Sequence, residues 1–142
     1  MIQIIEYQSQ EYLQSLELRQ KILRKPLGLD IYNDPLQEEI SDIHIAYFHD
    51  SKLIGIILLR PQNTVAKMRQ VAIDDSFQGK GIGQELVRFF EQYAKEKGFT
   101  TIQLHARATA VPFYQKLGYE VVGNTFTEVG IPHFAMQKSI IS

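Results

Sequence analysis

One segment of the chain decides its fold: Val71-Ala-Ile-Asp-Asp-Ser-Phe-Gln-Gly-Lys-Gly-Ile-Gly83. Its first three residues end a β-rich run, and the residues after it carry apolar side chains at helical spacing until Gly98 ends the predicted helix. The glycines in the turn between them let the backbone approach a ligand without obstruction by a Cβ atom. Unpaired backbone N–H groups and the positive end of the helix dipole meet at the same place. The segment therefore suits a phosphate or diphosphate group.

The spacing of this turn differs from that of two better-known phosphate loops. A P-loop needs its lysine after the last glycine, whereas Lys80 precedes Gly81. A dinucleotide-binding loop needs a glycine where Gln84 stands and an acidic residue where Gln103 stands. A β-to-α connection that needs glycine only for packing remains the alternative from spacing alone.

The rest of the chain alternates between β-rich runs and amphipathic segments. Asp50-Ser51 is the expected turn of a hairpin, Pro61-Gln-Asn63 is a second turn, and Thr109 is the expected N-cap of a short helix that Gly118 ends. The pattern contains no repeat or linker, so it indicates one α+β domain over residues 1–142. The predicted strands are 2–7, 44–49, 52–60, 64–73, 101–106, 119–126 and 133–138, and the helices outside the central one are 11–24 and 109–117.

Composition excludes several classes of function. The 142 residues carry a formal net charge of −1, which argues against a nucleic-acid-binding surface. There is no cysteine, so disulfides, thiolate zinc sites and a cysteine nucleophile are excluded, and no histidine pair has the spacing of a metal site. The longest apolar run, 53–59, is far below the ~20 residues that a membrane span needs. No targeting segment is visible, so we expect a cytoplasmic protein without a membrane or metal partner.

Two motifs resemble those of one enzyme superfamily. Residues 71–83 look like the acetyl-CoA signature of the GCN5-related N-acetyltransferases (GNAT), and Ala110-Val-Pro-Phe-Tyr-Gln-Lys-Leu-Gly-Tyr119 is similar to a second motif of that superfamily. The order of predicted strands agrees as well, so the resemblance covers nearly the whole chain. The ending Gly130-Ile-Pro-His-Phe-Ala-Met136 resembles a small single-domain branch of bacterial type.

The resemblance implies a fold and an activity. The fold is a mixed, mostly antiparallel central sheet, splayed near its middle, with helices on both faces. The activity is that of an acyltransferase of EC 2.3.1 type, which moves acetyl from acetyl-CoA to an amine in one step, without metal. Backbone N–H near Val71 is expected to stabilise the tetrahedral oxyanion. The residues expected to bind acetyl-CoA are Val71, Ala72, Ile73, Gln78, Gly79, Lys80, Gly81, Ile82, Gly83 and Gln84.

Tyr114 and His133 are the expected catalytic residues. By the resemblance, Tyr114 is the expected general acid toward the departing thiolate: it is best described as a hydrogen-bond donor, and transfer of its proton is left open. Packing on the inner face of its helix is the alternative. A base is needed because a lysine-like amine is only about 0.04% unprotonated at pH 7. His133 suits proton transfer, with Glu128, His105 and water chains as alternatives. Carboxylates that act as base elsewhere in the superfamily have no counterpart here, and Arg107 stands where many members carry a cofactor-binding asparagine.

The acceptor is less constrained by the sequence. We expect a small-molecule primary amine; a peptide or protein amine is second, and a non-catalytic acetyl-CoA-binding regulatory domain is an alternative of another class. The acidic segment Asp30–Asp42 is a candidate for attracting a cationic amine, and the alternative is a solvated surface balanced by preceding basic residues, of which Arg19 and Arg24 are two. Exposed strand ends of this fold often pair, so a homodimer is compatible with it.

Overall fold

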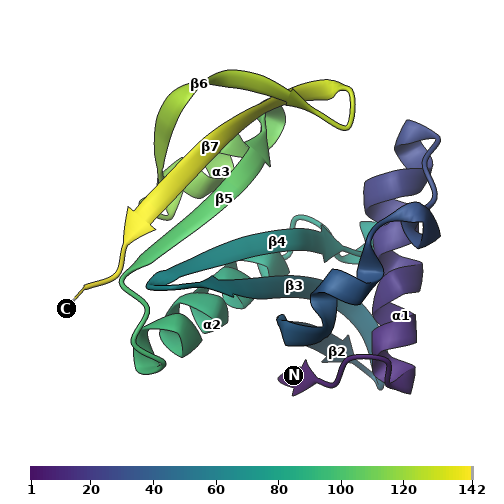
Figure 1. The fold of residues 1–142 in the computed structure, drawn as a ribbon. Helices are drawn as coiled ribbons and strands as arrows, with labels where there is room; N and C mark the ends of the chain where they lie inside the picture. The colour runs from purple at the N-terminus through teal and green to yellow at the C-terminus, as the bar shows by residue number, and fades with distance from the viewer. Residues whose placement is uncertain (142) are drawn as a thin grey trace.

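Seven strands form one mixed sheet in the order β1-β2-β3-β4-β5-β7-β6 (Figure 1). The computed structural model, which describes residues 1–141, pairs every neighbouring couple of strands antiparallel except β4 and β5, which are parallel. The predicted mixed, mostly antiparallel α+β architecture is confirmed. The strands are β1 (Ile2–Ile5), β2 (Ile43–His49), β3 (Lys52–Gln62), β4 (Val65–Ile73), β5 (Thr101–Arg107), β6 (Glu120–Glu128) and β7 (Ile131–Ser139).

The sheet splits between β4 and β5. These strands pair only over Val65–Met68 and Thr101–Leu104. Beyond that point β4 bulges: its pairing with β3 passes from Arg69 to Ala72, and Gln70 has a φ of 57°. A bulge bends its strand and increases the local twist, so β4 turns away from β5, which continues along β7. Figure 1 shows the two halves of the sheet diverging, which confirms the predicted splay.

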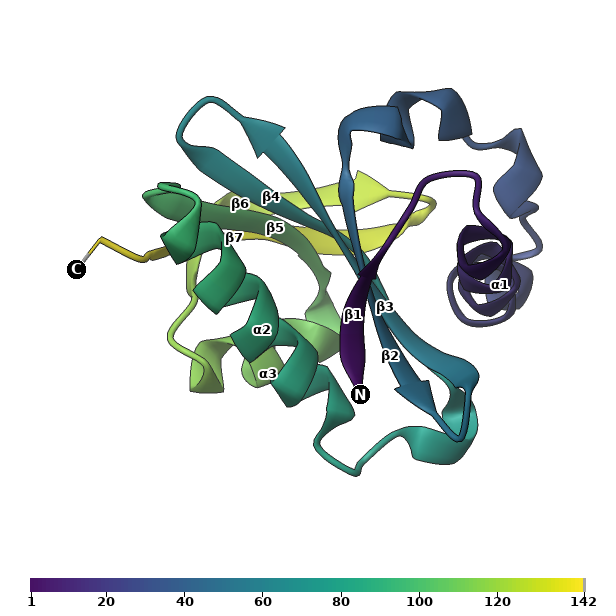
Figure 2. The same cartoon turned by 90° about the horizontal axis from the view of Figure 1, so that it is seen from below.

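Helices cover both faces of the sheet, as Figure 2 shows. Helix α1 (Gln10–Arg19) lies on one face, where its Leu18 belongs to a core with Ala46 and Ile56. Helices α2 (Ile82–Glu96) and α3 (Val111–Lys116) lie on the other face. Helix α2 buries Leu86, Val87 and Phe90, among others, in the larger core, which accounts for its helical apolar spacing.

Helix α1 ends earlier than its sequence pattern predicts. It starts after Ser9, whose hydroxyl accepts a hydrogen bond from the Tyr12 N–H at 3.1 Å, and after Arg19 the backbone widens into a π-helical turn, Gln20–Arg24. Short 3₁₀ helices follow between this turn and β2, and others connect later elements. Their bounds are Lys25–Leu27, Ile31–Asn33, Leu36–Ser41, Asp75–Phe77 and Ala108–Ala110.

Three local predictions need correction and one is confirmed. Asp50-Ser51 forms the expected hairpin turn, with φ of 49° and 64°. The second turn is shorter than predicted, because Pro61 and Gln62 belong to β3 and pair with β4. Thr109 lies inside a 3₁₀ turn and is not the N-cap of α3; Ala110 holds that position without a side-chain hydrogen bond. Strands β6 and β7 extend to a tight turn, so both are longer than predicted.

Candidate active site

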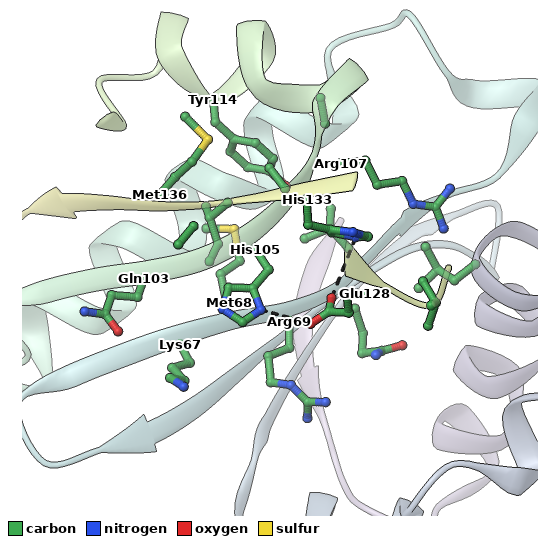
Figure 3. A pocket seen from close by; sticks show the side chains of 18 of the residues that line it. Lys67, Met68, Arg69, Gln103, His105, Arg107, Tyr114, Glu128, His133 and Met136 are labelled. Carbon is green, nitrogen blue, oxygen red and sulfur yellow. Dashed lines mark hydrogen bonds and ion pairs between the residues drawn. The ribbon is translucent and has the colours of Figure 1, made fainter. Parts of the chain in front are cut away.

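A cavity of about 540 Å³ lies where β4 and β5 separate (Figure 3). Its walls come from the π-helical turn after α1, from β4 and β5 on both sides of the point where their pairing ends, from α3 and from the β6–β7 hairpin. Ordinary ligand sites have volumes of roughly 300–1,000 Å³, so the space fits a small molecule. The side chains used below are Arg24, Lys67, Arg69, Val71, His105, Arg107, Tyr114, Glu128, Val129 and His133.

Tyr114 reaches this cavity from α3. Its ring packs against Phe113 and Tyr119, with centroids 5.0 and 5.7 Å away, so the packing expected as an alternative is present. Its hydroxyl nevertheless has no hydrogen-bond partner within residues 1–141, and Figure 3 shows it pointing toward His133. Burial raises the pKa of Tyr114 to about 12. The phenol is therefore a protonated donor at neutral pH, held by packing and free to hydrogen-bond to a ligand.

Three side chains form what we call the histidine–glutamate cluster: His105, Glu128 and His133. His105 Nδ1 lies 3.0 Å from Glu128 Oε1, and His133 Nε2 lies 3.7 Å from Glu128 Oε2. Phe126 packs against both rings, 4.8 Å from that of His105 and 6.1 Å from that of His133. The sequence raised these three residues as separate candidates for the base, and the hairpin brings them together.

The hydrogen bonds of His133 define which of its nitrogens can accept a proton. Its Nδ1 lies 3.0 Å from the carbonyl oxygen of Ile131. A carbonyl only accepts, so Nδ1 carries the proton and Nε2 is left with a lone pair. An imidazolium at His133 would be stabilised by the Glu128 carboxylate 3.7 Å from Nε2. His133 is buried, whereas His105 is about half exposed, so His133 is the better shielded of the two.

The glycine turn leads from the end of β4 into α2. Gly79 and Gly81 have φ of 77° and 83°, and a Cβ atom added to either would meet no atom within 4 Å. The space above the turn is therefore open, and glycine is required by the backbone conformation. Helix α2 starts directly after Gly81, and the first N–H groups of a helix have no partner within it. This combination fits a diphosphate group.

The structure brings only some of the predicted site residues together. Val71, Tyr114 and His133 line the cavity. Ala72 and Ile73 continue β4 beyond it, where β5 is no longer paired, and the turn from Gln78 to Gln84 follows them along the chain. The arrangement is thus one row of backbone groups that ends at the start of α2, beside a cavity that holds the titratable side chains.

The acidic segment is largely neutralised by basic side chains. Glu39 pairs with Arg19, Asp34 with Arg24 at 2.8 Å, and Asp42 with Arg60 at 2.8 Å. Burial by itself would raise the pKa of Glu39, but the hydrogen bonds and charge of Arg19 outweigh it and hold that pKa below its ordinary value. The alternative interpretation, in which basic residues balance the charge of this segment, therefore agrees with the structure. Because its carboxylates are paired, the segment has little attraction for a cationic amine.

Two further groups of residues were missed in the sequence. Arg19 is fully buried and its Nε donates to the side-chain oxygen of Gln70 at 3.2 Å, which ties α1 to the bulge of β4. Lys67 and Arg69 line the cavity from β4. The sequence signal that could have identified this pair is their spacing of two residues on a strand, because residues i and i+2 lie on the same face.

Two classes of feature are absent from residues 1–141. That part of the chain has no cluster of three or more histidine, cysteine, aspartate or glutamate side chains placed to bind a metal ion. None of its helices combines the length and the apolar character that crossing a membrane requires.

Comparison with known proteins identifies the family. A family model for the acetyltransferase (GNAT) domain matches residues 7–140. YyaT, an uncharacterized protein of Bacillus subtilis (strain 168), is 37% identical over 107 residues, which are 75% of this chain and 71% of YyaT. The uncharacterized N-acetyltransferase YjcF of the same organism is 30% identical over 122 residues, which are 82% of this chain and 87% of YjcF.

Solved structures share the fold. The crystal structure of a Lactobacillus plantarum protein assigned as an N-acetyltransferase has a TM-score of 0.86 and 26% identity, with 99% of each chain covered. An aminoglycoside 6'-N-acetyltransferase in complex with coenzyme A has a TM-score of 0.83 and 20% identity, over 100% of this chain and 98% of that one. The chain belongs to the GNAT acetyltransferases, a family of acyltransferases that use acetyl-CoA as co-substrate.

Proposed function

We propose that this chain, acting as one domain over residues 1–142, transfers acetyl from acetyl-CoA to the primary amine of a small molecule. One observation carries the proposal: a single cavity at the split of the sheet holds an unpartnered phenol and the histidine–glutamate cluster. The cavity has the volume of a small-molecule site and is bordered by the π-helical turn and by Val129 of the hairpin. These borders favour a small amine over a peptide.

The backbone of β4 and the glycine turn would hold the donor. Acetyl-CoA supplies an acetyl group already activated as a thioester. Val71, Ala72 and Ile73 would pair with its pantetheine arm as with an added strand, and Gly79, Gly81 and the N–H groups at the start of α2 would hold its diphosphate. Backbone N–H at the bulge beside Val71 would donate to the carbonyl oxygen as negative charge develops there.

Side chains of the cavity would then remove the proton of the amine and stabilise the leaving sulfur. The amine nitrogen forms a bond to the acetyl carbon, and the bond from that carbon to sulfur breaks. His133 Nε2 takes the proton that the amine loses, with Glu128 stabilising the charged ring. Tyr114 donates a hydrogen bond to the leaving sulfur, which departs as the thiolate of coenzyme A. The thiolate takes a proton from solvent to become the thiol, and His133 returns its proton to solvent. The products are an amide and free coenzyme A.

The test is a pair of measurements on the purified protein. Titration calorimetry measures acetyl-CoA binding, and a thiol assay measures coenzyme A release with a panel of small primary amines and peptides. We expect binding, amine-dependent release with small amines, and a Tyr114→Phe variant that binds acetyl-CoA normally but releases coenzyme A more slowly. Binding without release by any amine would support a regulatory domain instead, release only with peptides would reassign the acceptor, and absence of binding would overturn both functions.

A further inference from the structure

The cavity is rich in positive charge although the chain is not. Four cationic side chains line it against one carboxylate, whereas the formal net charge of the whole chain is −1. The carboxylate is Glu128, which already belongs to the histidine–glutamate cluster. The cations are Arg24, Lys67, Arg69 and Arg107.

Two of these cations on β4, Lys67 and Arg69, have no hydrogen-bond partner within the described residues. Neither makes a hydrogen bond in residues 1–141, and we call them the basic pair. The basic pair differs from Arg24, whose guanidinium makes two hydrogen bonds to Asp34, of 2.8 and 3.3 Å. The Arg24 guanidinium is thus already engaged, whereas the N–H donors of the basic pair are available to a ligand.

Arg69 is close to a carboxylate that another residue already uses. Its Nη1 lies 3.8 Å from Asp42 Oδ2, but both Asp42 oxygens accept hydrogen bonds from Arg60, at 2.8 and 3.0 Å. The side chain of Arg69 is only 33% exposed. Burial lowers the pKa of Arg69, and the charge of Arg60 lowers it further. A partly desolvated guanidinium without a hydrogen-bonding anion gains most from an anionic ligand.

The basic pair also lies beside the proposed reaction centre. Lys67 and Arg69 are two residues apart on β4, so their side chains leave the same face of the strand. The bulge at Gln70 and Val71 follows immediately. Figure 3 shows both side chains extending from β4 below the histidine–glutamate cluster. A ligand in the cavity can therefore meet carboxylate and imidazole, with Arg107 beside His133, at one end, and the basic pair at the other.

We propose that the acceptor is a small primary amine that also carries an anionic group, a carboxylate or a phosphate-like group, and that Lys67 and Arg69 bind that group. The inference rests on the proposed acetyl transfer and specifies its acceptor. The amine end lies against Glu128 and His133, and the anionic end against the basic pair. A diamine would instead place a second positive charge beside two cations, and the nearby carboxylate of Asp42 is already engaged by Arg60.

The test uses four amines of matched shape: propylamine, β-alanine, 2-aminoethylphosphonate and 1,3-diaminopropane. Their dissociation constants from the protein with coenzyme A bound are measured by NMR titration at low salt. A hydrogen bond to a charged group changes affinity by roughly 10- to 100-fold. We expect at least one anionic amine to bind about tenfold or more tightly than propylamine, and the diamine to bind most weakly. The carboxylate and the phosphonate show which anion fits.

Variants connect that preference to the basic pair. The double substitution Lys67→Gln with Arg69→Gln should remove the preference and leave propylamine binding and acetyl-CoA affinity unchanged, while Arg69→Lys should retain part of it. The surface control is Lys95→Gln, which removes one positive charge from an exposed part of α2 and should change nothing. Thermal unfolding of each variant verifies that it is folded.

Two results would overturn the inference: anionic amines that bind no better than propylamine, or a preference that survives the double substitution. A double variant that loses acetyl-CoA affinity while retaining its amine preference would also overturn it, since the pair would then serve the donor. Failure of acetyl transfer is separate, because it would appear as no coenzyme A release with any amine while the titration still reports on the basic pair.

Discussion

Arg19 on α1 donates a hydrogen bond of 3.2 Å to the side chain of Gln70, the residue at which β4 bulges. The same guanidinium is fully buried and hydrogen-bonds to both carboxylate oxygens of Glu39, which also accepts from the Tyr12 hydroxyl at 2.8 Å. The first helix is therefore connected to the point where the sheet splits. Because that bulge borders the proposed donor site, the network has consequences for both stability and activity.

Removal of the Arg19 charge should strongly destabilise the fold. Arg19→Met leaves the Glu39 carboxylate buried without its partner, and breaking a buried ion pair costs roughly 3–5 kcal/mol. We expect a decrease of that size in the free energy of unfolding, measured by urea denaturation at pH 7. Lys95→Met on the exposed side of α2 should stay within about 0.5 kcal/mol of the parent chain. A decrease below about 1 kcal/mol for Arg19→Met would contradict the role of the network.

Acid should reduce the stability that this ion pair provides. The pKa of Glu39 is lowered in the folded chain from an ordinary value of 4.5. A lowered pKa contributes stability above pH 4.5, and this contribution is lost as the pH falls through the folded-state pKa. The difference in unfolding free energy between the parent and Arg19→Met should therefore shrink between about pH 7 and pH 3. A constant difference over that range would show that Glu39 does not titrate as described.

Gly81→Ala should weaken acetyl-CoA binding more than it weakens the fold. The φ of 83° is strained for alanine, and the new methyl group would project into the open space of the glycine turn. We expect the dissociation constant for acetyl-CoA to rise about tenfold or more, by calorimetry. Gly98→Ala is the matched control, because Gly98 has a φ of 90° and equally open surroundings at the other end of α2. Equal effects of both substitutions on binding would point to strain alone.

Replacement of His133 should slow acetyl transfer without weakening donor binding. His133→Gln removes the proton acceptor, and loss of a general base typically lowers kcat by about 10²-fold or more. The defect should diminish for amines of low pKa, which are already unprotonated at neutral pH. His105→Gln, at the exposed end of the cluster, is the comparison and should have the smaller effect. A defect of the same size for all amines would assign His133 a structural role.

Tyr114→Phe tests whether the phenol acts as a hydrogen-bond donor and not as an acid that loses its proton during catalysis. Because burial raises the pKa of Tyr114 to about 12, the phenol stays protonated over the working range of the enzyme. We expect kcat to fall by about 10²-fold and the alkaline side of the pH–rate profile to remain unchanged in shape. An alkaline limb in the parent chain that disappears in Tyr114→Phe would instead show that the phenol titrates during catalysis.

The elements that local sequence determines were predictable, and the contacts between distant segments were not. The strand, glycine turn and helix around Gly81 follow from short-range periodicity and from backbone demands that only glycine meets. The π-helical turn after Arg19 replaces the predicted continuation of α1, and it occurs where that buried side chain pairs with Glu39, 20 residues away.

The candidate site shows the same division. Tyr114 was predictable because it lies in a recognisable motif, and His133 because a histidine at a strand start suits proton transfer. Both reach the cavity, although their catalytic roles remain predictions. That Arg69 makes no hydrogen bond was not predictable, because it depends on Arg60 donating to both carboxylate oxygens of Asp42. Which of two neighbouring arginines obtains a partner is decided only when β2, β3 and β4 are in register.

The bulged strand would separate recognition of the donor from recognition of the acceptor. In the proposed arrangement, β4 contacts the donor through main-chain groups, which every amino acid possesses, and contacts the acceptor through the side chains of Lys67 and Arg69. Substitutions at those two positions can therefore alter the accepted amine and leave acetyl-CoA recognition intact. In that arrangement one strand would recognise the donor through groups common to all residues, and the acceptor through two side chains that substitution can exchange.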